Sequence, residues 1–233
     1  MKKLRTIIRW VIWTIAGLYI TTIVLLHIPA VQGFLAQKVG DVAGNKLGTE
    51  VHVGRIDLGF INRFVLDDIL IYDQSHKKML SASRVGARVD IWHLLRTGEI
   101  NISSAQLFGL RAELYKTSKD AKPNFQFVLD SLASKDTTSH TPLHLSINSL
   151  VIRHGNIKYD CLDAPTTPNR LNLNHINVSD ISSYLILNKL DDTSVWADLR
   201  ALAFKEASGL EVKQLAFELK ANQQQATLRD FIF

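Results

Sequence analysis

The chain has 233 residues, 46% of them hydrophobic, with 27 Lys and Arg against 22 Asp and Glu. This is enough for one large or two small domains, and for a core or a membrane segment. The basic excess is concentrated at one end, because Lys2, Lys3, Arg5 and Arg9 all precede the first acidic residue, Asp41. Without these four, 23 basic residues face 22 acidic ones, so no basic stripe for binding nucleic acid remains.

An uncharged stretch near the N-terminus has the length of a membrane span. Residues 10–26 carry no charge, and His27 and Ile28 extend the stretch to 19 residues. At about 1.5 Å per residue it nearly crosses a hydrocarbon core of about 30 Å. We predict a transmembrane segment over 10–28, anchored by Trp10, Trp13, Tyr19 and Leu26. The basic tip 1–9 then stays in the cytoplasm, and the rest of the chain lies across the membrane.

A cleavable signal peptide is the alternative for the same stretch. Its apolar region normally has about 7–15 residues and ends at a small-x-small cleavage site. Here the apolar stretch is longer, ends on Ile23, Val24, Leu25 and Leu26, and is followed by Pro29. The sequence therefore favours an uncleaved signal anchor.

The next segment, residues 29–48, has the features of an amphipathic helix. Pro29 suits a first helical turn and Gly48 a C-terminal stop. Apolar residues recur near helical spacing at Val31, Phe34, Leu35, Val39, Val42 and Leu47. We expect the helix to cap the following domain, and the alternative is a helix on the outer membrane surface. Its internal glycines argue against one continuous helix.

From residue 49 onward one pattern recurs: apolar, any, apolar, two polar or glycine residues, apolar, any, apolar. Period two is typical of strands with one apolar side. The second polar residue would move the later half to the opposite face, unless a bulge or kink absorbs it. A face change between two sheets is the alternative. The copies are VHVGRIDL (51–58), FVLDDILI (64–71), LSASRVGA (80–87), INISSAQL (100–107), LSINSLVI (145–152), LNLNHINV (171–178), LEVKQLAF (210–217) and ATLRDFIF (226–233).

Two further segments read as return strands of hairpins, because each follows a copy of the pattern. They are GLRAELYK (109–116) and GNIKYD (155–160). With their preceding copies they align as ISSAQLFGLRAELY (102–115) and INSLVIRHGNIKYD (147–160), which indicates an internal repeat of about 45 residues.

One insertion, residues 117–142, interrupts the strands. It is polar at both ends, and NFQFVLDSLAS (124–134) predicts a short helix that starts at Asn124 or at the Lys122-Pro123 pair before it. We therefore predict a mostly β domain over 49–233, preceded by the span and the amphipathic helix.

An apolar sheet face needs a cover. A second sheet or a helix would make an ordinary sandwich, whereas lipid would leave an open, curled trough. The sheet begins just outside a membrane span, and the chain stops within a copy of the pattern at Phe231, Ile232 and Phe233. Such an ending leaves an unpaired apolar edge, which suggests a longer sheet and favours the open trough.

The chain offers no cluster typical of catalysis or metal binding. Cys161 is its only cysteine, and the neighbouring Asp160 and Asp163 would raise the pKa of the thiol. His140 and His144 cannot share a helix face because a proline lies between them. Dinucleotide, nucleophile-elbow and P-loop patterns are absent. We expect no enzyme activity, no metal and no cofactor.

Several segments carry a resemblance to a known family: residues 28–60, 65–85, 108–116 and 124–130. They resemble the N-terminal region of the TamB family, the translocation and assembly module proteins of Gram-negative envelopes, in its Bacteroidota form. TamB belongs to the AsmA-like group of bridge-like lipid-transfer proteins. The resemblance covers nearly this whole chain but only the start of the family's longer chain. The matching single residues are Gly48, Val53, Gly54, Asp67 and Asp73.

The resemblance implies a single-pass protein of the bacterial inner membrane, with an elongated, curved, taco-like β-groove in the periplasm. It implies passive movement of phospholipid acyl chains toward the outer membrane. It also implies outer-membrane protein assembly and secretion with an Omp85-type partner, which meets C-terminal parts absent here. The alternative is a structural or chaperone-like module that guides outer-membrane strands by edge pairing without carrying lipid.

If lipid fills the groove, the apolar positions of the recurring pattern line it. The candidates are Val51, Val53, Ile56, Leu58, Leu66, Ile69, Ile71, Val85, Val89, Ile100, Ile102, Leu107, Leu145, Ile147, Leu150 and Ile152. Plain core packing is the alternative role for each of them.

Overall fold

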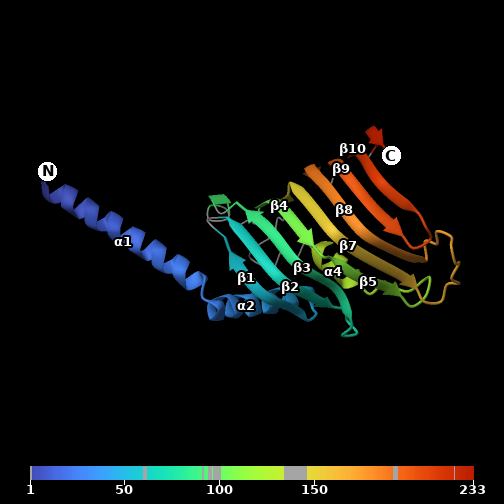
Figure 1. The fold of residues 1–233 in the computed structure, drawn as a ribbon, viewed down its shortest axis with the longest axis horizontal. Helices are drawn as coiled ribbons and strands as arrows, with labels where there is room; N and C mark the ends of the chain where they lie inside the picture. The colour runs from blue at the N-terminus through green and yellow to red at the C-terminus, as the bar shows by residue number, and fades with distance from the viewer. Residues whose placement is uncertain are drawn as a thin grey trace.

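Two helices lead into one large β-sheet (Figure 1). The computed structural model describes residues 2–59, 62–90, 92–93, 96, 101–133, 146–190, 194–222 and 224–233. Helices α1 (Lys2–Leu26) and α2 (Pro29–Leu47) come first, and α4 (Gln126–Ala133) lies in the insertion. The strands are β1 (Val51–Leu58), β2 (Arg63–Tyr72), β3 (Lys78–Val89), β4 (Asn101–Phe108), β5 (Arg111–Lys116), β6 (Ser146–Ile147), β7 (Ser149–Cys161), β8 (His175–Leu190), β9 (Ser194–Glu206), β10 (Glu211–Asn222) and β11 (Ala226–Ile232). The prediction of a mostly β chain is confirmed.

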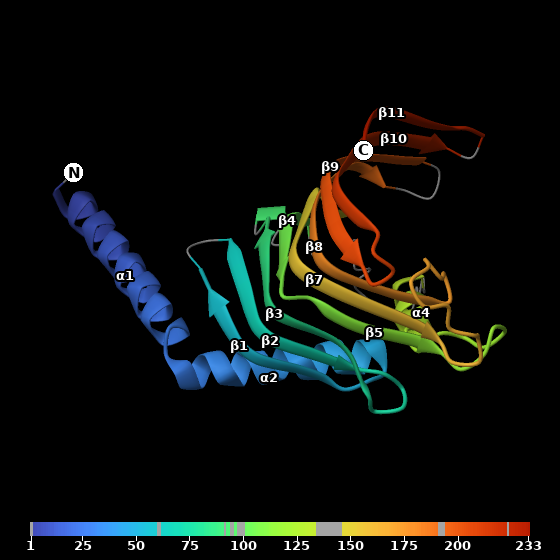
Figure 2. The same ribbon diagram turned by 45° about the vertical axis from the view of Figure 1, so that its right-hand side comes forward.

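The strand order in the sheet largely follows the chain. The path is β1-β2-β3-β4-β7-β8-β9-β10-β11, with β5 beside β3 and β7, and β6 beside β4. Neighbours are antiparallel, except that β6 and β7 run parallel to β4, and β7 to β5. Figure 2 shows that the strands bend as they cross the sheet.

Polar pairs in the first two copies and in the last copy of the recurring pattern coincide with kinks. Gly54 of β1 and Asp68 of β2 lie opposite each other between regular pairs, and Asp68 has a φ of 55°. Only a few per cent of residues other than glycine adopt a positive φ, and Asp tolerates it better than most. Asp230, in the polar pair of the last copy, has a φ of 52°, and the pairing of β11 with β10 shifts register beside it. The first kink keeps Val53 and Ile56 in one buried cluster. The kink interpretation therefore holds for this copy: the pairing of β1 with β2 keeps one register across Gly54 and Asp68, so there is no bulge here. The described strands form a single sheet rather than two.

The prediction of two hairpins is wrong. β4 and β5 lie end to end along the same neighbour, β3, and residues 155–160 continue β7. Gly109, with a φ of 62°, and His154, with a φ of 54°, bend these strands. A tight chain reversal needs at least two turn residues, so a single left-handed residue kinks a strand without reversing it.

The internal repeat has a structural counterpart. Ala105 pairs with Leu150 and Lys116 with Cys161, so the offset is 150 − 105 = 161 − 116 = 45 residues. The two copies therefore lie side by side and parallel, each residue next to its equivalent. Parallel neighbours need a long crossover, and the insertion provides it.

Helix α2 is one continuous helix in spite of its glycines. Its buried residues, Gln32, Ala36, Gly40 and Gly44, recur every fourth position and form one stripe. A Cβ added at Gly40 would lie 2.7 Å from the carbonyl oxygen of Val51. The glycines therefore let the helix backbone approach the strand, which is why they do not interrupt it.

The stripe covers the free edge of β1. The carbonyl of Glu50 accepts a hydrogen bond from the amide of Tyr72 in β2, so this carbonyl points toward β2. Successive strand residues alternate in direction, so the carbonyl of Val51 points to the open side, where Gly40 lies. Ala36 packs on Val53 and Ile56 in the same contact. The prediction that 29–48 caps the sheet is confirmed, with Gly48 as its left-handed C-cap at a φ of 69°. The predicted apolar face of this helix is wrong in part, because Phe34, Val39 and Val42 are exposed and the stripe of small residues packs on β1 instead.

Helix α1 projects away from the sheet (Figure 1). Its segment Thr6–Leu26 has 21 residues and a mean hydropathy of 1.7, and none of its most apolar window is buried. The predicted span 10–28 falls within α1 except for its last two residues. A helix of this length and composition is compatible with a single-pass anchor or with a signal sequence.

The insertion is tied to β5 by Asn124. Its side-chain oxygen accepts from the amide of Tyr115 at 2.9 Å, and its amide nitrogen donates to the carbonyl of Glu113 at 3.1 Å. Asn124 therefore does not cap α4, which begins at Gln126, although the predicted short helix is confirmed. α4 contacts α2, and Figure 1 shows α4 behind the sheet.

Candidate functional site

One face of the sheet is apolar over many strands. We call it the apolar face and define it by Val53 and Ile56, which pack on α2. Residues directly opposite each other in a sheet point to the same face. The register thus places these predicted lining residues on the apolar face: Val51, Val53, Ile56, Leu58, Leu66, Ile69, Ile71, Val85, Leu107, Leu150 and Ile152.

The other predicted lining residues are less fully placed. Val89 and Ile102 pair with each other beyond a register shift, and the backbone of Ile147 pairs with Ile102. Ile100 and Leu145 lie outside the described residues.

The apolar face continues into the second half of the sheet, where no lining residue was predicted. Leu150 pairs with Leu185, Leu185 with Leu199, and Leu199 with Phe217. Phe217 lies in a copy of the recurring pattern, so that copy could have indicated it. Leu185 and Leu199 lie outside all copies and become visible only through the register.

The apolar face is only partly covered. Val53 and Ile56 are buried beneath α2, each with 6% exposure. By contrast, Leu66, Leu107 and Leu150 stay half-buried although their strands are central. Leucines sealed between two layers are normally fully buried. Within the part of the chain that the structure describes, no second sheet lies over this face.

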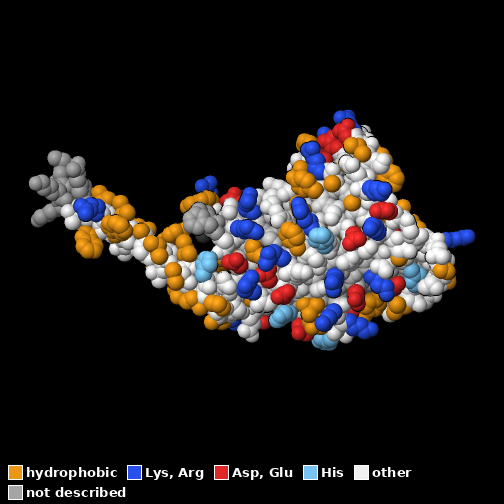
Figure 3. All heavy atoms as spheres, viewed as in Figure 1, with side chains coloured by type: hydrophobic (Ala, Val, Ile, Leu, Met, Phe, Trp, Pro, Cys, Tyr) orange, Lys and Arg blue, Asp and Glu red, His pale blue; other side chains and the backbone are white. Residues whose placement is uncertain are grey.

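The opposite face is polar. We call it the polar face; Figure 3 shows Lys, Arg, Asp and Glu spread across it. At its first kink the Asp67 carboxylate accepts hydrogen bonds from Arg55 at 2.8 Å and from Arg84 at 2.7 Å. The Arg84 bond lowers the pKa of Asp67, against the opposing effect of burial, and Arg55 adds to the lowering. Asp67 thereby bridges two arginines, one on strand β1 and one on strand β3.

A hollow of about 540 Å³ lies beside this kink. Its polar lining includes His52, Asp68, Arg111 and Glu113. None of the hydrogen bonds described for the hollow joins a nucleophile to a base, so it shows none of the geometry of nucleophilic catalysis.

Asp73, one of the residues that carry the family resemblance, has a structural role. Asp73 is 1% exposed, and its carboxylate accepts from the amides of Ser75 and Lys77 at 2.8 and 2.9 Å and from the Tyr115 hydroxyl at 2.9 Å. Burial raises the pKa of Asp73, but these donors outweigh it and the net pKa is lowered. The contacts lock the β2–β3 turn to β5.

Cys161 is buried, and its Sγ lies 3.0 Å from the Asp163 carboxylate. This hydrogen bond raises the pKa of the thiol, as its acidic neighbours predict. Among the described residues, no group of three or more His, Cys, Asp or Glu could hold a metal ion. His140 and His144 lie outside those residues.

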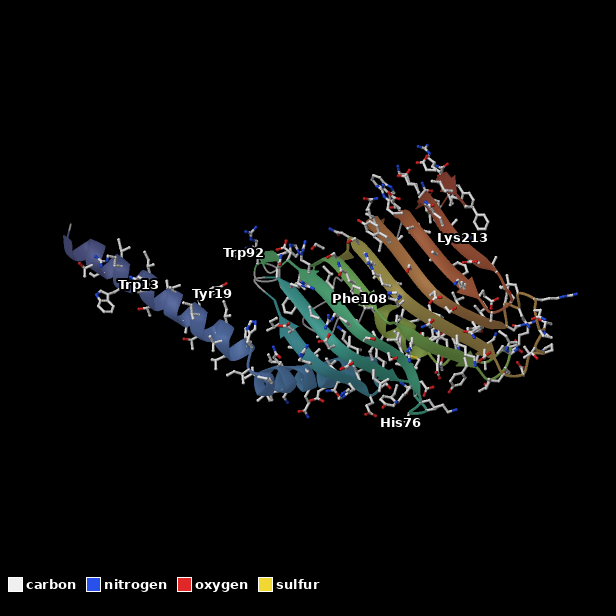
Figure 4. The ribbon with its side chains drawn as sticks, in the orientation of Figure 1. Trp13, Tyr19, His76, Trp92, Phe108 and Lys213 are labelled. Atoms are coloured by element: carbon white, nitrogen blue, oxygen red, sulfur yellow. The ribbon has the colours of Figure 1, made fainter. Side chains whose placement is uncertain are left out.

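The predicted anchor residues lie on α1. Trp10 and Trp13 are each 71% exposed and Tyr19 48%, and Figure 4 shows Trp13 and Tyr19 projecting from the helix. Leu26 ends the helix. The hydroxyl of Thr14 donates to the carbonyl of Trp10 at 2.9 Å, so it needs no water partner. Of the predicted cytoplasmic charges, Arg9 is exposed, and the side chains of Lys2, Lys3 and Arg5 lie outside the described part.

Comparison with protein-family models and with curated proteins found no match to this chain.

Proposed function

We propose that this chain is a membrane-anchored module that receives phospholipid acyl chains on its apolar face and moves them away from the bilayer. The observation that carries the proposal is the half-buried state of Leu107, Leu150 and their neighbours, on a sheet that follows an apolar N-terminal helix. Apolar surface left in water is unfavourable, and extended patches of it mark sites for lipid or protein. The bend of the strands in Figure 2 supports a groove.

The energetics suit passive transfer. Each CH₂ group kept out of water retains about 0.8 kcal/mol, so an acyl chain that passes from the bilayer to the apolar face keeps most of its stabilisation. The phospholipid headgroup stays in water at the margin of the sheet. Because the apolar face runs from β1 to β10, a lipid can pass from the apolar residues of one strand to those of the next without a covalent step.

The resemblance to TamB and other AsmA-like proteins supports the same function. In that setting the protein sits in the inner membrane of a Gram-negative bacterium, with the sheet in the periplasm. It carries phospholipid toward the outer membrane and supports outer-membrane protein assembly and secretion with an Omp85-type partner.

A second candidate is a chaperone-like module that guides outer-membrane strands. It is favoured by the last described strand, β11, which pairs with β10 on one side. Its Leu228 and Phe231 are 51% and 60% exposed. An exposed apolar edge strand is suited to adding a further strand from another chain.

Photo-crosslinking in membranes tests the proposal. A photoreactive residue at Leu107 or Leu150 should form phospholipid adducts, whereas one at Gln106 should not. Gln106 is the matched control, because it adjoins Leu107 in β4 but is exposed on the polar face. Absence of lipid adducts at both apolar positions would overturn the lipid proposal. Adducts of unfolded outer-membrane strands at Phe231 in that case would support the chaperone.

A further inference from the structure

Two arginines face each other at one end of the sheet. Arg63, the first residue of β2, pairs directly with Arg88 near the end of β3, and both are exposed. Like charges directly opposite in a sheet repel. Elsewhere on the same face Asp67 bridges Arg55 and Arg84, whereas no ion pair to Arg63 or Arg88 is found among the described residues. This pair therefore offers two cationic groups to an external anion.

A tryptophan lies at the same end of the sheet. Trp92 follows β3 after a short connection and is 75% exposed. The turn that carries it is held by the amide of His93, which donates to the Asp90 carboxylate at 3.0 Å. Figure 4 shows Trp92 at the edge of the sheet nearest α1, and His76 at a distant edge. We call this end, defined by Arg63, Arg88 and Trp92, the rim.

The rim faces the membrane that α1 would cross. Gly44 of α2 adjoins Thr49, just before β1, while Ala36 packs on Val53 and Ile56 further along. α2 therefore runs antiparallel to β1, and its N-terminus lies near the end of β1, which is the rim end. Because α1 ends only two residues before α2 begins, α1 leaves the sheet at the rim.

We propose that the rim rests on the bilayer that holds α1, with Arg63 and Arg88 contacting the phosphates of anionic phospholipids and Trp92 lying among the headgroups. Arginine binds phosphate through two parallel hydrogen bonds, and tryptophan is enriched at membrane interfaces. This contact rests on the proposed function, since it needs α1 to be a membrane anchor. It places the apolar face directly at the lipid source.

Depth-dependent quenching tests the contact in the full chain. Trp92→Cys and, as control, His76→Cys are labelled with an environment-sensitive fluorophore and placed in nanodiscs containing brominated phospholipid. Cys161 is buried, so the unsubstituted chain serves as the labelling blank. We expect several-fold stronger quenching at position 92 than at position 76. Equal quenching at the two positions would overturn the proposal.

Charge reversal tests the role of the arginines. Arg63→Glu combined with Arg88→Glu should abolish the quenching at position 92 in nanodiscs with anionic lipid. The charge-matched control, Lys122→Glu with Lys213→Glu, changes two exposed residues away from the rim and should leave quenching unchanged. Equal quenching in nanodiscs with and without anionic lipid would refute the phosphate contact.

The outcome separates this contact from the proposed function. Lipid adducts at Leu107 together with an unquenched position 92 would leave lipid uptake standing and remove the rim contact. Failure of the chain to remain with the nanodiscs would instead remove the anchor on which both depend.

Discussion

Replacing Gly40 with alanine tests whether α2 rests on the edge of β1. The added Cβ would lie 2.7 Å from the Val51 carbonyl oxygen, and ordinary contact begins at 3.4 Å, so helix or strand must shift by 3.4 − 2.7 = 0.7 Å. Such overpacking costs about 1–3 kcal/mol. The helical preference of alanine offsets about 0.8–1 kcal/mol of this cost. We therefore expect Gly40→Ala to lower the free energy of unfolding by up to about 2 kcal/mol.

Gly33→Ala is the matched control on the same helix. No atom lies within 4 Å of its added Cβ, so only the helical preference acts and we expect a gain of about 1 kcal/mol. Thermal unfolding of the two variants in detergent, followed by far-UV circular dichroism, should therefore give Tm changes of opposite sign. Each kcal/mol corresponds to about 2–4 °C in a chain of this size. A rise in Tm for Gly40→Ala equal to that of Gly33→Ala would refute the edge contact.

The remaining predictions concern the two faces and the buried carboxylates. Leu107→Lys should reduce lipid crosslinking at Leu150 several-fold without unfolding the sheet, and Gln106→Lys should leave it unchanged; equal effects would contradict the assignment of faces. Asp67→Asn removes the charge that bridges two arginines and should lower the free energy of unfolding, measured in urea. The loss should be only about 1 kcal/mol, because the arginine partners are half-exposed and screened by water. An unchanged midpoint would argue against the bridge. The pKa values of Asp67 and Asp73 are below the ordinary value of 3.8, so their stabilisation is complete above that pH and is lost as the pH falls through the folded-state values. At pH values below about 4, the urea concentration at the unfolding midpoint should therefore decrease, and it should decrease less in Asp73→Asn. An equal decrease in that variant would contradict this role of Asp73.

Local patterns account for the elements that were predicted well. The β1 pattern, with its apolar residues on both sides of a polar pair, depends on neighbours within eight residues. The limits of α2 follow from Pro29 and Gly48, whose backbone preferences act at their own positions. These effects need no knowledge of the rest of the fold, so the sequence alone is sufficient.

Long-range contacts account for what the sequence did not reveal. Gly109 is compatible with a reversal or a kink, and the neighbouring strand β3 decides between them. The glycines of α2 weaken an isolated helix, but Gly40 allows the approach to Val51. Asp73 meets Tyr115 across 42 residues of chain, which no periodicity could indicate.

The parallel pairing of the two repeat copies sets a length limit on the insertion. Strands β4 and β5 lie end to end and run from Asn101 to Lys116. The chain leaves β5 at Lys116 and must return to Ser146, which lies beside Asn101 at the other end of these two strands. Fifteen steps of about 3.3 Å separate those ends, or about 50 Å. Of the 29 intervening residues, the eight in α4 cover about 12 Å, and the other 21 reach about 70 Å when stretched. The connection from Lys116 to Ser146 is thus about ten residues longer than the distance requires. A longer deletion would force α4 to unwind or the two copies to separate.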